Sequence, residues 1–243
     1  MEVSVQDVAM PGDVIKEIFK SGGTKEKTIL GPGLRRDGDV VYACKAGVVK
    51  KRDPSIYYID SYQKRYIPRR GESVVGVVTQ KAGDIFKVDI GASEQASLSY
   101  MAFEGANKRN RPNVQAGDVV YAKLLVASKD MEPELICVDS HGKKGKLGIL
   151  SPDGMLFTCS INLVRKILNP ECPLINMLSK RKVCELAIGV NGKVWIKSRS
   201  VQDTIGIANA ILATEYTSTE NMKAIFDELF DGIAAPNDCS TLP

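Results

Sequence analysis

A stretch of short β-rich runs, from Gly71 to Val138, constrains the fold of this chain more than any other part of the sequence. Its apolar residues alternate with polar ones or gather in short blocks, and Gly, Asp and Lys-Asp turns separate these blocks. Such runs are typical of a small antiparallel barrel or sandwich. Their number and spacing fit the five-strand OB barrel, whose outer surface commonly binds oligonucleotides. We therefore expect an OB-type barrel in the middle of the chain.

The chain is long enough for one large domain or for two to three small ones. It has 243 residues, of which 44% are hydrophobic and 26% are charged, as in an ordinary folded soluble protein. No apolar run approaches the ~20 residues that a membrane helix needs. Residues 1–10 lack the charged-then-apolar pattern of a secretory signal. We therefore expect neither a membrane protein nor a secreted one.

The cysteines do not form a metal-binding pattern. No two of them make a Cys-x-x-Cys pair, and a zinc site would need clustered ligands. The sequence therefore favours reduced thiols in an intracellular protein, with no metal and no cofactor. The six cysteines are widely scattered, at Cys44, Cys137, Cys159, Cys172, Cys184 and Cys239.

The charge is distributed unevenly along the chain. The net charge is +4, but residues 203–243 hold seven acids and one base, Lys223, for a net charge of −6. Residues 1–202 therefore carry +10. A basic body with an acidic end suits a protein that faces a polyanion on one side.

Residues 1–66 predict a small β domain with its own meander. Turn signals separate its short apolar runs, and we expect strands at residues 40–44, 47–49, 56–59 and 65–67. The apolar residues are too few for a large independent core, so this domain should pack on a neighbour within the chain or on another chain.

Basic residues near the tyrosines of this region have two interpretations. The runs at residues 50–52, 64–65 and 69–70 would suit phosphate contacts, with tyrosines available to stack on bases. They would equally suit a solvated strand edge, where Lys and Arg block unwanted pairing. We favour the solvated edge.

Residues 67–144 should form the barrel, and alternation assigns the two faces of its second strand. Phe86, Val88 and Ile90 share one face, which should be the barrel interior. Lys87 then points outward, toward the surface where OB folds hold nucleic acid.

The loop at residues 107–113 is the best RNA-binding candidate. Lys108, Arg109 and Arg111 stand among amides in a segment without apolar periodicity, and phosphates favour such a combination of charge and adaptable donors. The alternatives are a solvated loop or a loop that docks on the acidic surface of a partner protein.

A second basic run follows at residues 141–146. Its Lys143 and Lys144 would suit phosphate contacts, but its glycines make a linker to the final domain an equal alternative. We interpret His141, the only histidine, as a surface residue.

Residues 147–232 predict a mixed α+β domain. Two strand-like runs, at residues 184–188 and 193–198, follow a partly helical segment at residues 170–182. Helical spacing of apolar residues continues at residues 201–214 and 219–230. The tail at residues 233–243 has no periodicity and should be disordered.

The chain resembles the ribosomal RNA-processing protein 40 family of non-catalytic cap subunits of the eukaryotic RNA exosome. The resemblance begins with GESVVGVVTQKAGDIFKVDIG, from Gly71, and with Ala96–Asp118, which look like an S1-type OB domain. It continues in Gly31–Arg36 upstream and Gly189–Trp195 downstream, and covers roughly residues 10–230.

The resemblance implies three domains and a function in RNA processing. The N-terminal domain would sit against a ring of RNase-PH-like subunits, and the C-terminal domain would be of the KH type. Partners would be those ring subunits, the other cap subunits and single-stranded RNA, with no membrane and no DNA. The complex would process or degrade rRNA, mRNA and other RNAs in the nucleus, nucleolus and cytoplasm.

The chain departs from the common S1 pattern on its outer face. Nucleic-acid-binding members carry aromatics there, whereas this chain has Asp84 and Lys87, and Ser99 where a histidine is frequent. The loss of stacking removes roughly 1–3 kcal/mol per base. We therefore expect weak and mostly electrostatic binding of RNA by the isolated chain.

The motif Gly189-Val190-Asn191-Gly192 has two interpretations. A functional KH loop is GxxG, joins two helices and clamps the RNA backbone. Here the motif lies between two strand-like runs, and Asn-Gly signals a tight hairpin, so we favour a structural role for Gly189, Asn191 and Gly192. Trp195, the only tryptophan, should be a buried anchor in a core or between domains.

The sequence argues against an enzyme. A nuclease needs converging carboxylates or an acid–base pair, and phosphorolysis needs a phosphate cradle; neither pattern is visible. We therefore expect a non-catalytic RNA-binding subunit. The alternatives are a structural assembly subunit without RNA contact and a translation-type S1 factor that acts alone.

Overall fold

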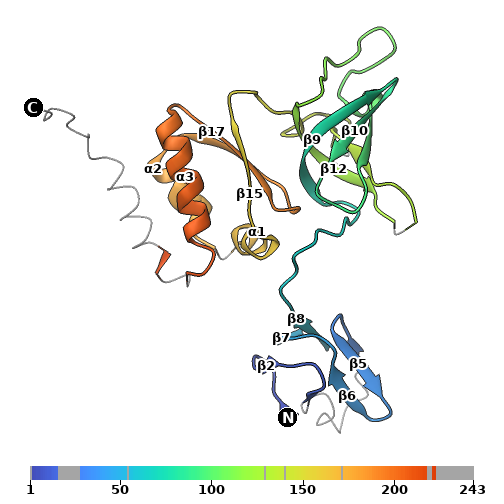
Figure 1. The fold of residues 1–243 in the computed structure, drawn as a ribbon, viewed down its shortest axis with the longest axis vertical. Helices are drawn as coiled ribbons and strands as arrows, with labels where there is room; N and C mark the ends of the chain where they lie inside the picture. The colour runs from blue at the N-terminus through green and yellow to red at the C-terminus, as the bar shows by residue number, and fades with distance from the viewer. Residues whose placement is uncertain are drawn as a thin grey trace, which may run out of the picture. The chain divides into compact units, whose positions relative to one another are not determined.

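The chain forms two compact units, Met1–Gln63 and Lys64–Pro243 (Figure 1). The computed structural model describes residues 2–15, 28–53, 55–128, 130–139, 141–170, 172–217 and 221–222. The predicted helix at residues 219–230, apart from residues 221–222, and the predicted tail at residues 233–243 lie outside these ranges.

The described part of the first unit contains two four-stranded sheets, with the orders β1-β3-β6-β5 and β2-β7-β8-β4. Apolar residues from both sheets meet in one core, which includes Ile15, Val41, Val49 and Ile59. The strands predicted at residues 40–44, 47–49 and 56–59 are present as β6, β7 and β8. The bounds are β1 (Glu2–Val3), β2 (Val8–Ala9), β3 (Val14–Ile15), β4 (Ile29–Leu30), β5 (Leu34–Asp37), β6 (Val40–Ala43), β7 (Gly47–Arg52) and β8 (Ile56–Asp60).

The strand predicted at residues 65–67 is wrong, because this segment is irregular. Tyr66 is buried on the barrel core, and its hydroxyl donates a hydrogen bond to Glu72 at 2.6 Å. Burial and this carboxylate raise the pKa of Tyr66. Tyr66 therefore anchors the segment that leads into the barrel, and it does not belong to a strand.

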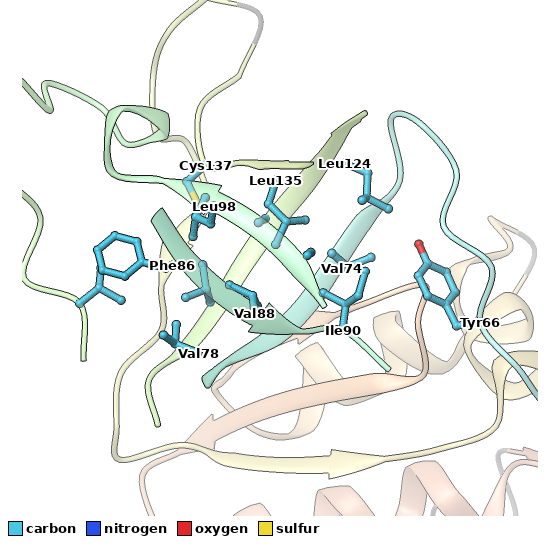
Figure 2. Packing of buried hydrophobic residues seen from close by; sticks show 14 of the residues in the cluster. Tyr66, Val74, Val78, Phe86, Val88, Ile90, Leu98, Leu124, Leu135 and Cys137 are labelled. Carbon is cyan, nitrogen blue, oxygen red and sulfur yellow. The ribbon is translucent and has the colours of Figure 1, made fainter. Parts of the chain in front are cut away.

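A closed barrel begins the second unit. The sheet has the order β13-β11-β10-β9-β12-β14, and an additional pairing of β12 with β13 closes it. Val74, Phe86, Val88 and Leu98 point into the interior (Figure 2), and Lys87 faces outward, as predicted from the alternation. The bounds are β9 (Ser73–Ala82), β10 (Ile85–Asp89), β11 (Ala96–Ser99), β12 (Val119–Val126), β13 (Glu134–Ile136) and β14 (Gly148–Ile149).

The C-terminal region combines a three-stranded sheet, of order β15-β17-β16, with three helices among its described residues. Serine caps start two of these helices: the hydroxyl of Ser160 accepts the amide of Leu163 in α1, and that of Ser200 accepts the amide of Gln202 in α3. The bounds are β15 (Met155–Thr158), α1 (Ile161–Leu168), α2 (Leu174–Arg181), β16 (Cys184–Ile188), β17 (Lys193–Ser198) and α3 (Val201–Ala213).

Alternation along β17 separates the two faces of this sheet. Val194 and Ile196 join a core formed with the three helices, whereas Trp195 joins a second cluster with Val75 of the barrel. Helices therefore cover one face of the sheet and the barrel covers the other (Figure 1).

Candidate nucleic-acid interface

Lys87 lies on the outer wall of the barrel, where the sequence predicted it, but its charge is paired. Residue 87 stands opposite Ser97 of β11, and its side-chain ammonium donates a hydrogen bond to the carboxylate of Glu132 at 2.5 Å. Glu132 comes from the connection between β12 and β13, 45 residues further along the chain. The strand thus presents an ion pair to the solvent instead of a free cation.

Arg111 is also paired with a carboxylate. Its guanidinium lies 2.9 Å from a carboxylate oxygen of Asp84 and stacks on the ring of Tyr100, 4.9 Å from the ring centroid. Tyr100 starts a short 3-10 helix, Tyr100–Ala102, and is itself buried. The cation–π contact and the ion pair place the Arg111 guanidinium beside the barrel, with a carboxylate partner for its charge.

Lys108 and Arg109 stand at the exposed tip of the same loop. The side-chain oxygen of Asn107 accepts the backbone amides of Arg109 and Asn110, at 3.1 and 2.8 Å, and closes a tight turn. Both basic side chains are exposed, and the described residues contribute no ion pair to either. These two cations are therefore available to phosphates.

The two predicted basic loops lie side by side. The amide of Lys144 donates to the carboxylate of Glu104 at 2.8 Å, and the amide of Cys137 donates to the carbonyl of Ala102 at 3.0 Å. Lys143 is exposed, and its carbonyl accepts the amide of Asp139. The structure thus brings the segment of Lys143 and Lys144 to the base of the loop that carries Lys108 and Arg109.

The Gly189–Gly192 motif joins β16 to β17 as a hairpin. Gly192 has a φ of +84°, and a Cβ atom there would meet the carbonyl oxygen of Cys159 at 2.7 Å, so the turn requires glycine. The segment that joins helices α1 and α2 is residues 169–173, Asn-Pro-Glu-Cys-Pro, which contains no glycine. The position where a KH domain holds its GxxG clamp thus lacks that motif.

Asn191 makes three hydrogen bonds to the barrel. Its side-chain nitrogen donates to the carbonyls of Val75 and Ile90, at 2.8 and 2.7 Å, and its oxygen accepts the amide of Val75 at 3.3 Å. The side-chain amide therefore satisfies barrel backbone groups in the way that a neighbouring strand would.

Lys193 and Trp195 extend this contact. The ammonium of Lys193 donates to the carboxylate of Asp89 at 2.7 Å, and this hydrogen bond lowers the pKa of Asp89. The indole of Trp195 is 3% exposed and packs against Val75. Both residues point toward the barrel, so the Trp195 ring is not accessible for stacking on a base.

Several of these contacts have no signal in the sequence. Glu132 and Asp84 were not expected to pair with predicted RNA-binding residues, because ion pairs between distant segments leave no local pattern. The reach of Asn191 to Val75, 116 residues earlier, is equally invisible in the sequence. The local signatures were limited to the alternation that placed Lys87 outward and to the Asn-Gly turn.

The described residues offer no metal centre: no group of three or more His, Cys, Asp or Glu side chains among them could hold an ion. Within the same ranges, no helix is both long enough and apolar enough to cross a membrane.

Curated relatives match this chain along nearly its whole length. It is 47% identical to the exosome complex component RRP40 of Drosophila melanogaster over 228 residues, which cover 94% of this chain and 97% of the relative. It is 42% identical to the human RRP40 over 92% of this chain and 85% of the relative. The chain belongs to the RRP40 family of exosome complex components.

Family models and a solved structure agree with the fold of this chain. A model of the N-terminal region of mammalian exosome complex component RRP40 matches residues 7–62, a model of the S1 domain of exosome complex component RRP40 matches residues 66–148, and a KH-domain model matches residues 154–202. The exosome complex component Rrp4 of Methanothermobacter thermautotrophicus is 26% identical over 94% of this chain and 69% of the relative. A crystal structure described as a putative exosome complex RNA-binding protein has a TM-score of 0.55, covers 69% of this chain and 98% of its own, and shares 20% identity, so it shows the fold alone.

Proposed function

We propose that this chain is a non-catalytic, RNA-binding cap subunit of the RNA exosome. Its relatives are exosome components, and its S1 and KH domains belong to RNA-binding classes. The chain would bridge RNase-PH-like ring subunits and other cap subunits, and the nuclease activity would come from other subunits. The assembly would act on rRNA, mRNA and other RNAs in the nucleus, nucleolus and cytoplasm.

Two adjacent basic loops support the proposed contact with RNA. Lys108 and Arg109 are exposed and unpaired among the described residues, and the Lys143–Lys144 segment joins their loop through Glu104. Such charges attract the sugar–phosphate backbone without reading bases. Lys87 and Arg111 would contribute less than these four, because each already has a carboxylate partner.

Charge reversal in the assembled complex tests this assignment. We expect Lys108→Glu with Arg109→Glu to weaken binding of a single-stranded oligoribonucleotide and to flatten its salt dependence. The log–log slope should fall by about 0.7 for each phosphate that the variant no longer neutralises. The matched control reverses two exposed lysines elsewhere, Lys45 and Lys180, and should leave the slope unchanged. Unchanged binding by the loop variant across a salt series would refute the assignment.

A structural assembly subunit without direct RNA contact is the second candidate. The carboxylate partners of Lys87 and Arg111 favour it, because they cancel positive charge on the barrel face. Crosslinking of RNA to the purified complex, with mapping of the attached peptides, separates the two functions. Crosslinks within residues 103–146 support RNA contact, and their absence there supports the structural role.

A further inference from the structure

The outer wall of the barrel contains an apolar hollow of about 320 Å³ that the basic loops do not use. Its floor comes from β11 and β13, and its rim from the start of β10, the 3-10 helix and the end of β12. The described residues that line it are Ile85, Ser97, Ser99, Met101, Ala102, Leu125, Glu134, Leu135 and Ile136.

The hollow results from small side chains that are set among larger ones. Ser97 and Ser99 point outward from β11, and Ser99 stands opposite Ile85 of β10. The rim is apolar and accessible: Met101 is 63% exposed, Ile85 44% and Leu125 42%. Contiguous exposed apolar side chains around a depression mark an interaction site.

The charges of this face do not suit RNA. The described lining residues include one carboxylate, Glu134, and no Lys or Arg. Lys87, two residues after the lining residue Ile85, is already held by Glu132, and Arg111 is held by Asp84, the residue before Ile85. The same lining residues include no aromatic ring on which a base could stack, so a phosphate backbone would meet an uncompensated negative charge here.

A second hollow of about 340 Å³ adjoins the first and shares Leu125 and Ile136 with it. Its described lining includes two bases, Arg70 and Lys123, and one acid, Asp139. The two hollows together form a groove that is apolar in the middle, acidic at one end and predominantly basic at the other.

We propose that this groove binds an extended peptide segment of a partner protein. An aliphatic or aromatic side chain of the peptide occupies the hollow over Ser97 and Ser99. A Lys or Arg on one side of that anchor faces Glu134, and an Asp or Glu on the other side faces Arg70 and Lys123. Charge complementarity then fixes the direction of the peptide, and the apolar anchor supplies most of the buried surface. This site is distinct from the basic loops and does not depend on RNA.

An array of synthetic nonapeptides tests the proposal with the full-length chain. Each peptide carries a central Leu or Phe, and Lys and Glu are placed on either side in both orders or in scrambled order. We expect one order to bind better than the other and better than the scrambled peptides. Affinity of the best peptide, measured by fluorescence anisotropy, should fall ten-fold or more in Leu125→Ser and in Glu134→Lys.

Matched controls come from exposed residues of the C-terminal region. Leu212→Ser and Glu185→Lys remove the same groups on α3 and β16 and should leave peptide affinity unchanged. All four variants should keep the wild-type melting temperature, since all four side chains are exposed. The proposal is overturned if no ordered peptide binds better than its scrambled counterpart. It is also overturned if oligouridylate binds the chain and Leu125→Ser abolishes that binding while Lys108→Glu/Arg109→Glu does not, because the hollow would then be a base subsite.

Discussion

The side-chain amide of Asn191 connects the C-terminal hairpin to the barrel through three hydrogen bonds. Replacement by alanine leaves the amide of Val75 and the carbonyls of Val75 and Ile90 buried without these partners. We expect Asn191→Ala to lower the free energy of unfolding by about 1–3 kcal/mol. Urea denaturation measures this loss, with the exposed Asn176→Ala as the control. Equal stability of the two variants would show that the amide contributes nothing to the joint.

The ion pair of Asp89 with Lys193 predicts a pH dependence. The Lys193 hydrogen bond lowers the pKa of Asp89 in the folded chain, below the ordinary value of about 3.9. Its contribution to stability is therefore present above that value and is lost as the pH falls through the folded pKa. Asp89→Asn should be less stable than the wild type at pH 7, and the difference should shrink below about pH 4. A difference that stays constant between about pH 7 and about pH 3 in urea unfolding would contradict this origin.

At the scale of elements, the turn before β15 depends on the absence of a side chain at Gly154. A Cβ atom there would lie 2.2 Å from Cε2 of the Trp195 indole. We expect Gly154→Ala to cost about 1–3 kcal/mol through overpacking. In the double variant with Trp195→Phe the smaller ring should relieve part of the clash, so the two losses should not add. Strict additivity in thermal or urea unfolding would exclude this contact as the cause.

Elements with a local signal were predictable from the sequence, and those fixed by distant contacts were not. The alternation of Phe86, Val88 and Ile90 identified the inner face of β10 and of the residue that follows it, and Asn191-Gly192 identified the hairpin. The strand predicted at residues 65–67 was wrong, because Tyr66 is buried through packing on the barrel core and a hydrogen bond to Glu72, and not through strand pairing. The pairing of Lys87 with Glu132, and the hollow beside Ser97 and Ser99, arise only when the barrel closes.

At the scale of the whole molecule, the cations that we propose for RNA contact lie mainly on two loops beside the barrel, because Lys87 and Arg111 have carboxylate partners. The barrel face holds ion pairs and an apolar groove. The Gly189–Gly192 hairpin of the KH domain contacts the barrel through Asn191. We therefore expect the isolated chain to bind RNA weakly, and the assembled exosome to bind it more tightly.

The affinity of the isolated chain for RNA, compared with that of the assembled exosome, tests this account most directly. A labelled single-stranded oligoribonucleotide would be titrated with each, over a series of salt concentrations. We expect the isolated chain to bind with a Kd of roughly 10⁻⁴ to 10⁻⁶ M that weakens steeply with salt, as in non-specific electrostatic binding, and the assembly to bind more tightly. Nanomolar binding by the isolated chain, with little dependence on salt, would contradict the account.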